Sequence, residues 1–348
     1  MHTMGRYLRS AVLLGLLGLA AAWAVLKRLT KPSVNQDNTS PQVQPGDRGH
    51  ESHVTRPSSS VETIVFFTVA LVGYLLLSYG DGDSSLSETR QWFVWRVVAA
   101  LGIALAYVMA YRAVWTSLNL PLVMRKALSV PLVIGYFSAA VALVGGAFAF
   151  LLLSISGREW PIPAMNARLV GVALAVGLTA VPWIYITLVA HRSLVRWPPS
   201  KPIGEVLELW DILMSCVTGF AVLVVVALVP TGALRSVWLA QDPLTEALEA
   251  QFPASDVLLY GAFFAVIISA LMVPVLASWR HKGREIVSRT HPLRNTGDLT
   301  EEWQSARSRL EAVLHLDVGI LRNPLTAFAL FTPLITSVLA GFIPELAN

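Results

Sequence analysis

The chain has 348 residues, of which 55% are hydrophobic and only 14% are charged, and its formal net charge is +4. Soluble domains carry about 25% charged residues, so the composition excludes a water-soluble globular protein and indicates a membrane protein. The basic surplus does not predict nucleic-acid binding, because Lys and Arg gather in the cytoplasmic loops of membrane proteins. The single cysteine, Cys216, excludes an internal disulfide and a cysteine zinc site, and we expect no metal or cofactor.

Taken in chain order, the apolar residues form eight stretches that are long enough, or nearly long enough, to cross a bilayer. A spanning helix needs about 20 apolar residues, and its backbone amides must be hydrogen-bonded within the helix. The stretches are 10–26, 61–79, 92–115, 131–156, 169–190, 212–229, 257–278 and 324–343. We therefore predict an all-α polytopic integral membrane helical bundle of about eight transmembrane helices, or seven if the first or the last stretch does not span.

The first stretch and the segment after it are expected to form an anchor and a tether. Basic residues before a short apolar run resemble a secretory signal peptide, but Lys27 and Arg28 after the run are typical of a retained cytoplasmic stop. We predict an N-terminal transmembrane anchor over 1–30, with cleavage as the alternative. Residues 31–60 are polar and lack apolar periodicity, which predicts a flexible linker.

The distribution of positive charge predicts the orientation. With the N-terminus outside, 19 of the 26 Lys and Arg residues lie in cytoplasmic segments, as the positive-inside rule requires. The excess of 21 Arg over 5 Lys is typical of a GC-rich bacterial genome. We therefore expect a multi-pass protein of the bacterial cytoplasmic membrane.

Residues 61–278 are predicted to form a six-helix transmembrane body. Small residues recur along the apolar stretches 131–156 and 169–190, where they allow helix backbones to approach closely. We single out Gly145, Gly146, Gly177 and Pro182 as candidates for a pore lining or a hinge. Tight helix packing without further function is the alternative.

A short amphipathic pattern precedes the sixth stretch. Ile203, Leu207 and Trp210 share one helical face, while Glu205 and Glu208 lie opposite. The pattern predicts a helix in the cytoplasmic interface. It would serve as an anchor or as a lever that couples cytoplasmic events to the next helix.

Residues 279–323 form the largest predicted cytoplasmic segment, which begins with a basic cluster. Arg280, Lys282 and Arg284 come directly after an apolar stretch. Such clusters bind anionic head groups, so we predict these three residues as lipid head-group contacts.

The second half of this segment predicts an amphipathic helix. Asp298 and Glu301 have the spacing of a capping box, and an apolar stripe that includes Trp303 and Leu310 follows a heptad-like rhythm. We consider Trp303 and Leu310 candidates for oligomerisation or gating. The stripe would pack against the protein's own helices or form a seam between subunits.

The last segment, 324–348, is predicted to be a kinked helix. Pro324 and Pro333 remove intrahelical hydrogen bonds. The helix would cross the membrane or form a re-entrant or interfacial segment.

One motif bears on enzymatic activity. Gly80-Asp81-Gly82-Asp83 resembles the GxGD element of aspartyl intramembrane proteases, which implies a pair of catalytic aspartates. The remaining candidate for the second aspartate is Asp211, which follows Trp rather than Tyr, and the family's Pro-Ala-Leu element is absent. The predicted topology also places Asp83 and Asp211 on opposite sides. A plain turn fits the residues better, and we predict that the protein is not an enzyme.

The leading functional prediction is a non-enzymatic channel or pore, or a membrane-perturbing effector, which is homo-oligomeric and gated from the cytoplasmic side. It rests on the lack of catalytic residues and of charged residues at the centres of the spans. The second reading is a carrier for a neutral or lipidic substrate, which is consistent with the uncharged centres. A scaffold subunit of a membrane complex, with a protein partner bound through 31–60 or 299–315, is the third reading.

Overall fold

The protein is helical throughout the residues that the computed structural model describes. These are residues 59–79, 89–121, 124, 129–155, 165–197, 203–240, 252–292, 300–316 and 331–339. Helices account for 92% of them, and no strand occurs among them. This confirms the predicted all-α class.

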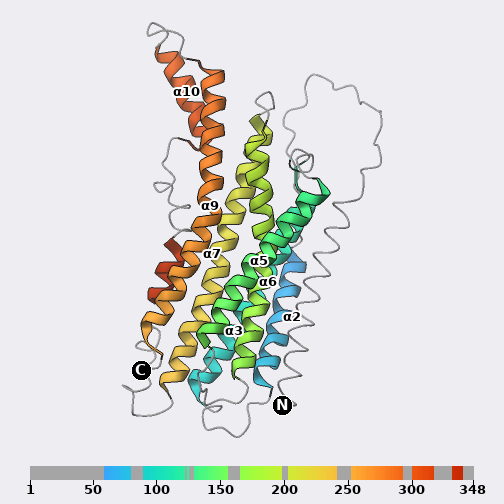
Figure 1. The fold of residues 1–348 in the computed structure, drawn as a ribbon, viewed down its shortest axis with the longest axis vertical. Coiled ribbons are helices and arrows are strands. Elements are labelled where there is room, and N and C mark those ends of the chain that lie inside the picture. Colours follow the sequence, from blue (N-terminus) through green and yellow to red (C-terminus); the bar gives the residue numbers. More distant parts are fainter. Residues whose placement is uncertain are drawn as a thin grey trace.

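Six helices of the described part of the chain are long and apolar enough to cross a membrane. They are α2 (Ser59–Ser78), α3 (Arg90–Leu118), α5 (Val130–Ile155), α6 (Met165–Val195), α7 (Ile203–Leu239) and α9 (Ala254–Thr290). They run side by side as a bundle, and the short polar helix α10 (Glu301–Val313) folds back beside the end of α9 (Figure 1). The arrangement is that of a polytopic membrane helical bundle.

The outer surface of the bundle is apolar, as a lipid environment requires. On α2, the side chains of Ile64, Phe67 and Leu71 are 65%, 66% and 61% exposed. Exposing these apolar surfaces to water would cost a free energy of about 25 cal/mol per Å². Lipid tails are as apolar as the side chains themselves. The exposed face of α2 is therefore a lipid-facing surface.

Two helices are much longer than a bilayer is thick. α7 and α9 each contain 37 residues, and each is about 55 Å long at the helical rise of 1.5 Å per residue. The hydrocarbon core is about 30 Å thick. The amphipathic segment predicted at 203–210 forms the first turns of α7, and the predicted boundary after residue 278 lies inside α9. The end of α9 and all of α10 project beyond the other helices (Figure 1).

The centre of the bundle is formed by α3, α6 and α7, with α2 packed along α3. α6 and α7 approach closely at Gly219, where an added Cβ would lie 2.6 to 2.9 Å from ring atoms of Trp183. α2 and α3 are joined by a bidentate ion pair, in which both contacts between the Arg112 guanidinium and the Glu62 carboxylate measure 2.7 Å.

Residues 331–339 form a short helix, and its polar side chains point inward. Thr332, Thr336 and Ser337 are buried, whereas the exposed positions carry Phe, Leu, Ile and Val. Ser337 lies so close to Gly261 of α9 that the glycine has no room for a Cβ. A polar interior and an apolar exterior suit a lipid-embedded helix. Whether the whole 324–343 stretch spans the membrane stays a prediction.

Several predictions fall outside the described residues. They include the anchor at 1–30, nearly all of the linker at 31–60 and the motif at residues 80–83.

Candidate apolar ligand cavity

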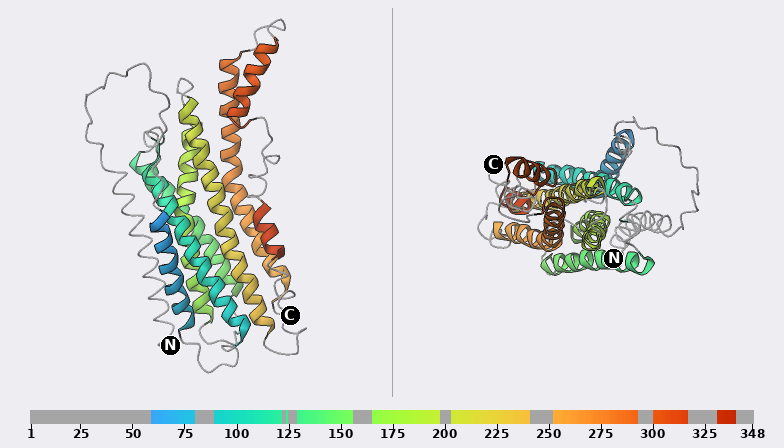
Figure 2. Two further views of the ribbon diagram at one scale, coloured as in Figure 1. Left: turned by 180° about the vertical axis from the view of Figure 1, so that it is seen from behind. Right: turned by 90° about the horizontal axis from the view of Figure 1, so that it is seen from above.

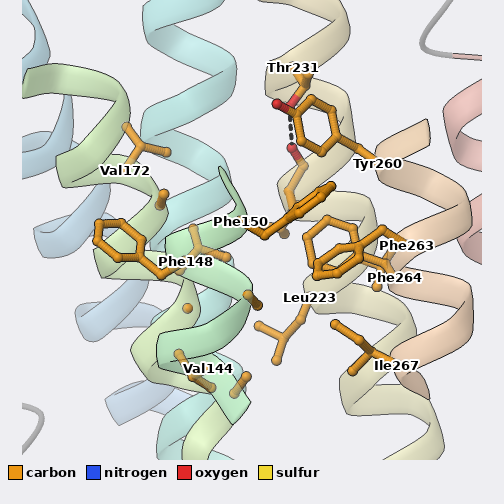
Figure 3. A pocket seen from close by; sticks show the side chains of 18 of the residues that line it. Val144, Phe148, Phe150, Val172, Leu223, Thr231, Tyr260, Phe263, Phe264 and Ile267 are labelled. Atoms are coloured by element: carbon orange, nitrogen blue, oxygen red, sulfur yellow. Dashed lines mark hydrogen bonds between the residues drawn. The ribbon is translucent and has the colours of Figure 1, made fainter. Parts of the chain in front are cut away.

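A cavity of about 240 Å³ lies between α5, α6, α7 and α9. α5 contributes Leu143 to Phe150, α7 contributes Phe220 to Leu234, and α9 contributes Tyr260 to Leu271. Figure 3 shows aromatic side chains of α5 and α9 pointing into it from opposite sides. The four helices therefore border a space that their own side chains do not fill.

The lining of the cavity is apolar and uncharged. None of the described residues that line it is Asp, Glu, Lys, Arg or His. The hydroxyl groups in the lining belong to Thr231 and Tyr260 (Figure 3). The Thr231 hydroxyl donates a hydrogen bond to the carbonyl of Ala227 at 2.8 Å, so the helix itself satisfies it. The cavity presents a surface for hydrocarbon rather than for ions.

The cavity is elongated along the helix axes. Its lining on α6 runs from Leu169 to Ile184, which corresponds to about 22 Å of helix. This is roughly two-thirds of the hydrocarbon core. Buried residues line both ends: Trp95 (1% exposed) and Phe252 at one, and Ile184 (3% exposed) and Phe220 at the other.

Of the four candidate pore or hinge residues, the structure places Gly177 at the cavity and Gly145 and Gly146 elsewhere. Gly177 lines the cavity, and a Cβ added there would touch Val144 of α5 at 3.4 Å. Gly145 and Gly146 are exposed, and a Cβ added to either would meet nothing within 4 Å. They mark the outer face of α5 rather than a tight contact.

The fourth candidate, Pro182, lies inside α6, which continues through it as one helix. Pro230 and Pro274 lie inside α7 and α9 in the same way. Internal prolines remove one hydrogen bond each, so three of the four helices around the cavity carry a weakened point.

At the projecting end of α9, the predicted stripe of α10 packs against its own chain. Leu310 contacts the main hydrophobic core, and the ring centroid of Trp303 lies 6.3 Å from that of His291. The Arg307 guanidinium lies 5.3 Å from the Trp303 ring centroid. The intramolecular alternative for the stripe therefore describes this structure, and a seam between subunits stays a prediction.

The predicted start of α10 needs a correction. The N-cap is Thr300, whose hydroxyl accepts a hydrogen bond from the backbone N–H of Trp303 at 3.2 Å, and not Asp298. The Asp298–Glu301 spacing fits the sequence pattern of a capping box. Thr300, however, has extended backbone angles, directly precedes the helix and caps it.

The predicted lipid head-group residues lie on α9 just beyond its apolar stretch. Lys282 forms an ion pair with Glu285 at 2.8 Å, and Arg284 is exposed and borders a groove between α9 and α10. Arg280 is half-buried. The continuous helix places all three within two turns of the end of the apolar stretch, and their binding of anionic lipids stays a prediction.

Sequence reasoning missed an aromatic cluster that ties α10 to the bundle. The ring of Trp210 on α7 lies 5.0 Å from that of Trp279 on α9 and 5.0 Å from that of His315. The indole N–H of Trp279 donates to the carbonyl of Leu314 at 3.1 Å. His315 takes a positive φ of 54°, which ends α10 and turns the chain onto Trp210. The sequence signal that could have indicated this cluster is the position of Trp210 on the apolar face of the amphipathic pattern.

The fold and the cavity define a polytopic helical membrane protein with an internal apolar cavity. Comparison with known proteins adds no family to this description, because no protein-family model, curated protein or solved structure matches the chain.

Proposed function

We propose that the protein binds an uncharged, hydrophobic molecule inside the bilayer, with the acyl part of a lipid as its natural occupant, and acts as a carrier for such substrates. The observation that carries this proposal is the uncharged and partly aromatic lining of the cavity between α5, α6, α7 and α9. Ligand pockets are typically concave, apolar and provided with few polar groups, and this cavity has those properties.

The position of the cavity supports a lipidic occupant. It runs along about 22 Å of α6, between residues 169 and 184, within helices whose outer faces contact lipid. Acyl chains surround the protein at that depth, so no aqueous step is needed to deliver one. The lining carries hydroxyl groups at Thr231 and Tyr260, and that of Thr231 is bonded within α7, so an acyl chain suits the cavity better than a polar group does.

The same lining disfavours a water-filled path through this cavity. Water enters a cavity when two to four polar partners are present, and apolar cavities remain dry. The predicted channel or pore therefore gains no support from this site. An oligomeric pore, a membrane-perturbing effector and a scaffold stay predictions, as does the absence of enzymatic activity.

The proposal is tested by filling the cavity from α5. Ala147 lines the cavity, whereas Ala149 on the same helix is exposed and outside it. Purified protein in liposomes is irradiated with a photoactivatable alkyl probe, and the labelled peptides are identified. We expect labelling of α5, α6 and α9 in the wild type, a loss of about tenfold or more in Ala147→Phe, and wild-type labelling in the control Ala149→Phe.

Two results would contradict the proposal. One is labelling of the wild type confined to exposed residues such as those of α2. The other is equal labelling of cavity residues in Ala147→Phe and Ala149→Phe, which would show that the cavity does not hold the probe.

A further inference from the structure

The residues that line the cavity differ in burial between its ends and one of its sides. Trp95, Phe252, Ile184 and Phe220 at the two ends are all buried. Along the side, where α5 faces α9, the lining residues Phe150 and Phe263 are partly exposed. The side that faces lipid is therefore the less sealed boundary.

α5 lies at the edge of the bundle, on the opposite side from α2 (Figure 2). It packs along α6, with Val144 opposite Gly177. Across the cavity it reaches α9 through the stacked rings of Phe150 and Phe263, whose centroids are 4.5 Å apart with an interplanar angle of 19°. Figure 3 shows these two rings side by side in the space between α5 and α9.

The two rings of a stacked phenylalanine pair can separate easily. Such a pair contributes little beyond the area that it buries, and partly exposed side chains change rotamer within nanoseconds. The rings carry no hydrogen-bonding group, so opening them into lipid leaves no polar atom without a partner. α5 also has Gly145 and Gly146 about one turn before Phe150, in open space, and neighbouring glycines are frequent points of helix bending.

We propose that the space between α5 and α9 is a lateral portal through which an acyl chain passes between the bilayer and the cavity, with Phe150 and Phe263 as its gate. This inference rests on the proposed function. It adds the route: the occupant enters from the side, out of the lipid, and not through either buried end.

The experiment links the two helices reversibly across the portal. In a Cys216→Ala background, Phe150→Cys and Phe263→Cys are joined with a short bis-methanethiosulfonate reagent, which a reductant cleaves. The matched control joins α2 to α3 through Gly73→Cys and Ala100→Cys, because a Cβ on Gly73 would lie 3.7 Å from that of Ala100. The measured quantity is the exchange rate of a fluorescent fatty acid between the protein and liposomes.

We expect the link across the portal to slow both uptake and release by about tenfold or more, and reduction to restore them. The link between α2 and α3 should leave both rates unchanged. A second variant, Phe263→Ala, removes the gate without any cross-link. It should accelerate exchange by about two- to tenfold, the factor that corresponds to the loss of one aromatic pair.

The outcomes separate this inference from the proposed function. If the wild-type protein binds no fatty acid, the proposed function fails and the portal fails with it. If the fatty acid binds in the cavity but both the portal link and Phe263→Ala leave its exchange rates at the wild-type values, the cavity is a ligand site and the lateral route is wrong.

Discussion

The contact between α6 and α7 and the contact between α5 and α9 use similar apolar and aromatic residues but pack very differently. At the first, Gly219 leaves a space that the Trp183 ring occupies. At the second, Phe150 and Phe263 meet at the edge of a cavity. Both contacts lie between long apolar helices, so composition does not distinguish them.

The difference shows what holds helices together in lipid. Without a hydrophobic driving force between helices, association depends on close packing and on interhelical polar contacts. Gly219 contributes because a large ring occupies the space above it. Gly145 and Gly146 are as small, but they face open space and draw no helix closer. A small residue thus strengthens a helix contact when its partner fills the gap.

The largest expected effect comes from breaking the packed contact. Gly219→Ala would place a methyl group 2.6 to 2.9 Å from ring atoms of Trp183, and the ring, which is 2% exposed, has little room to move. Overpacking of this kind costs about 1–3 kcal/mol. We expect that loss of unfolding free energy, measured by titrating the detergent-solubilised protein with SDS.

The matched control is Gly146→Ala. A Cβ there meets nothing within 4 Å, and alanine favours the helix over glycine by about 1 kcal/mol. We expect unchanged or slightly higher stability. Equal destabilisation by the two substitutions would show that glycine packing does not separate the two contacts.

The sequence predicted the spans well because a long apolar run has one stable form in lipid, a helix. It predicted helix ends less well at α9, where the basic cluster after Ser278 marks the end of the apolar stretch but not the end of the helix, which continues to Thr290. Charged residues indicate where an apolar stretch ends. Only local backbone signals, such as the Thr300 cap of α10, report where a helix starts or stops.

The cavity could not be predicted from the sequence. Phe67 faces lipid, Phe150 faces the cavity and Trp183 is buried against α7, yet all three occupy apolar runs. In a soluble protein, polar residues mark the outer face of a helix. In a membrane helix, lipid, cavity and neighbouring helix are all apolar environments, and the sequence pattern does not tell them apart.

A smaller effect is expected where the projecting α10 meets the bundle. It tests whether α10 opens independently of the packed helices. Trp279→Phe keeps an aromatic ring but removes the N–H that donates to the Leu314 carbonyl. A hydrogen bond of this kind contributes about 1 kcal/mol. We expect roughly fivefold faster hydrogen exchange in α10, measured by mass spectrometry.

Exchange within α2 and α3 of the same variant serves as the internal reference and should stay unchanged. Faster exchange across the whole bundle would mean that α10 and the packed helices form one cooperative unit.

The smallest effect is expected from the ion pair that joins α2 to α3 on the packed side. The Glu62 carboxylate and the Arg112 guanidinium make two contacts of 2.7 Å, but the Arg112 side chain is 50% exposed. Exposed ion pairs contribute about 0.2–1 kcal/mol. A double-mutant cycle of Glu62→Gln and Arg112→Gln, followed by SDS titration, should give a coupling energy within that range. A larger coupling would mean that the ion pair contributes more to holding α2 on the bundle than does the packing at Gly73, where an added Cβ would lie 3.6 Å from the Cα of Ala100.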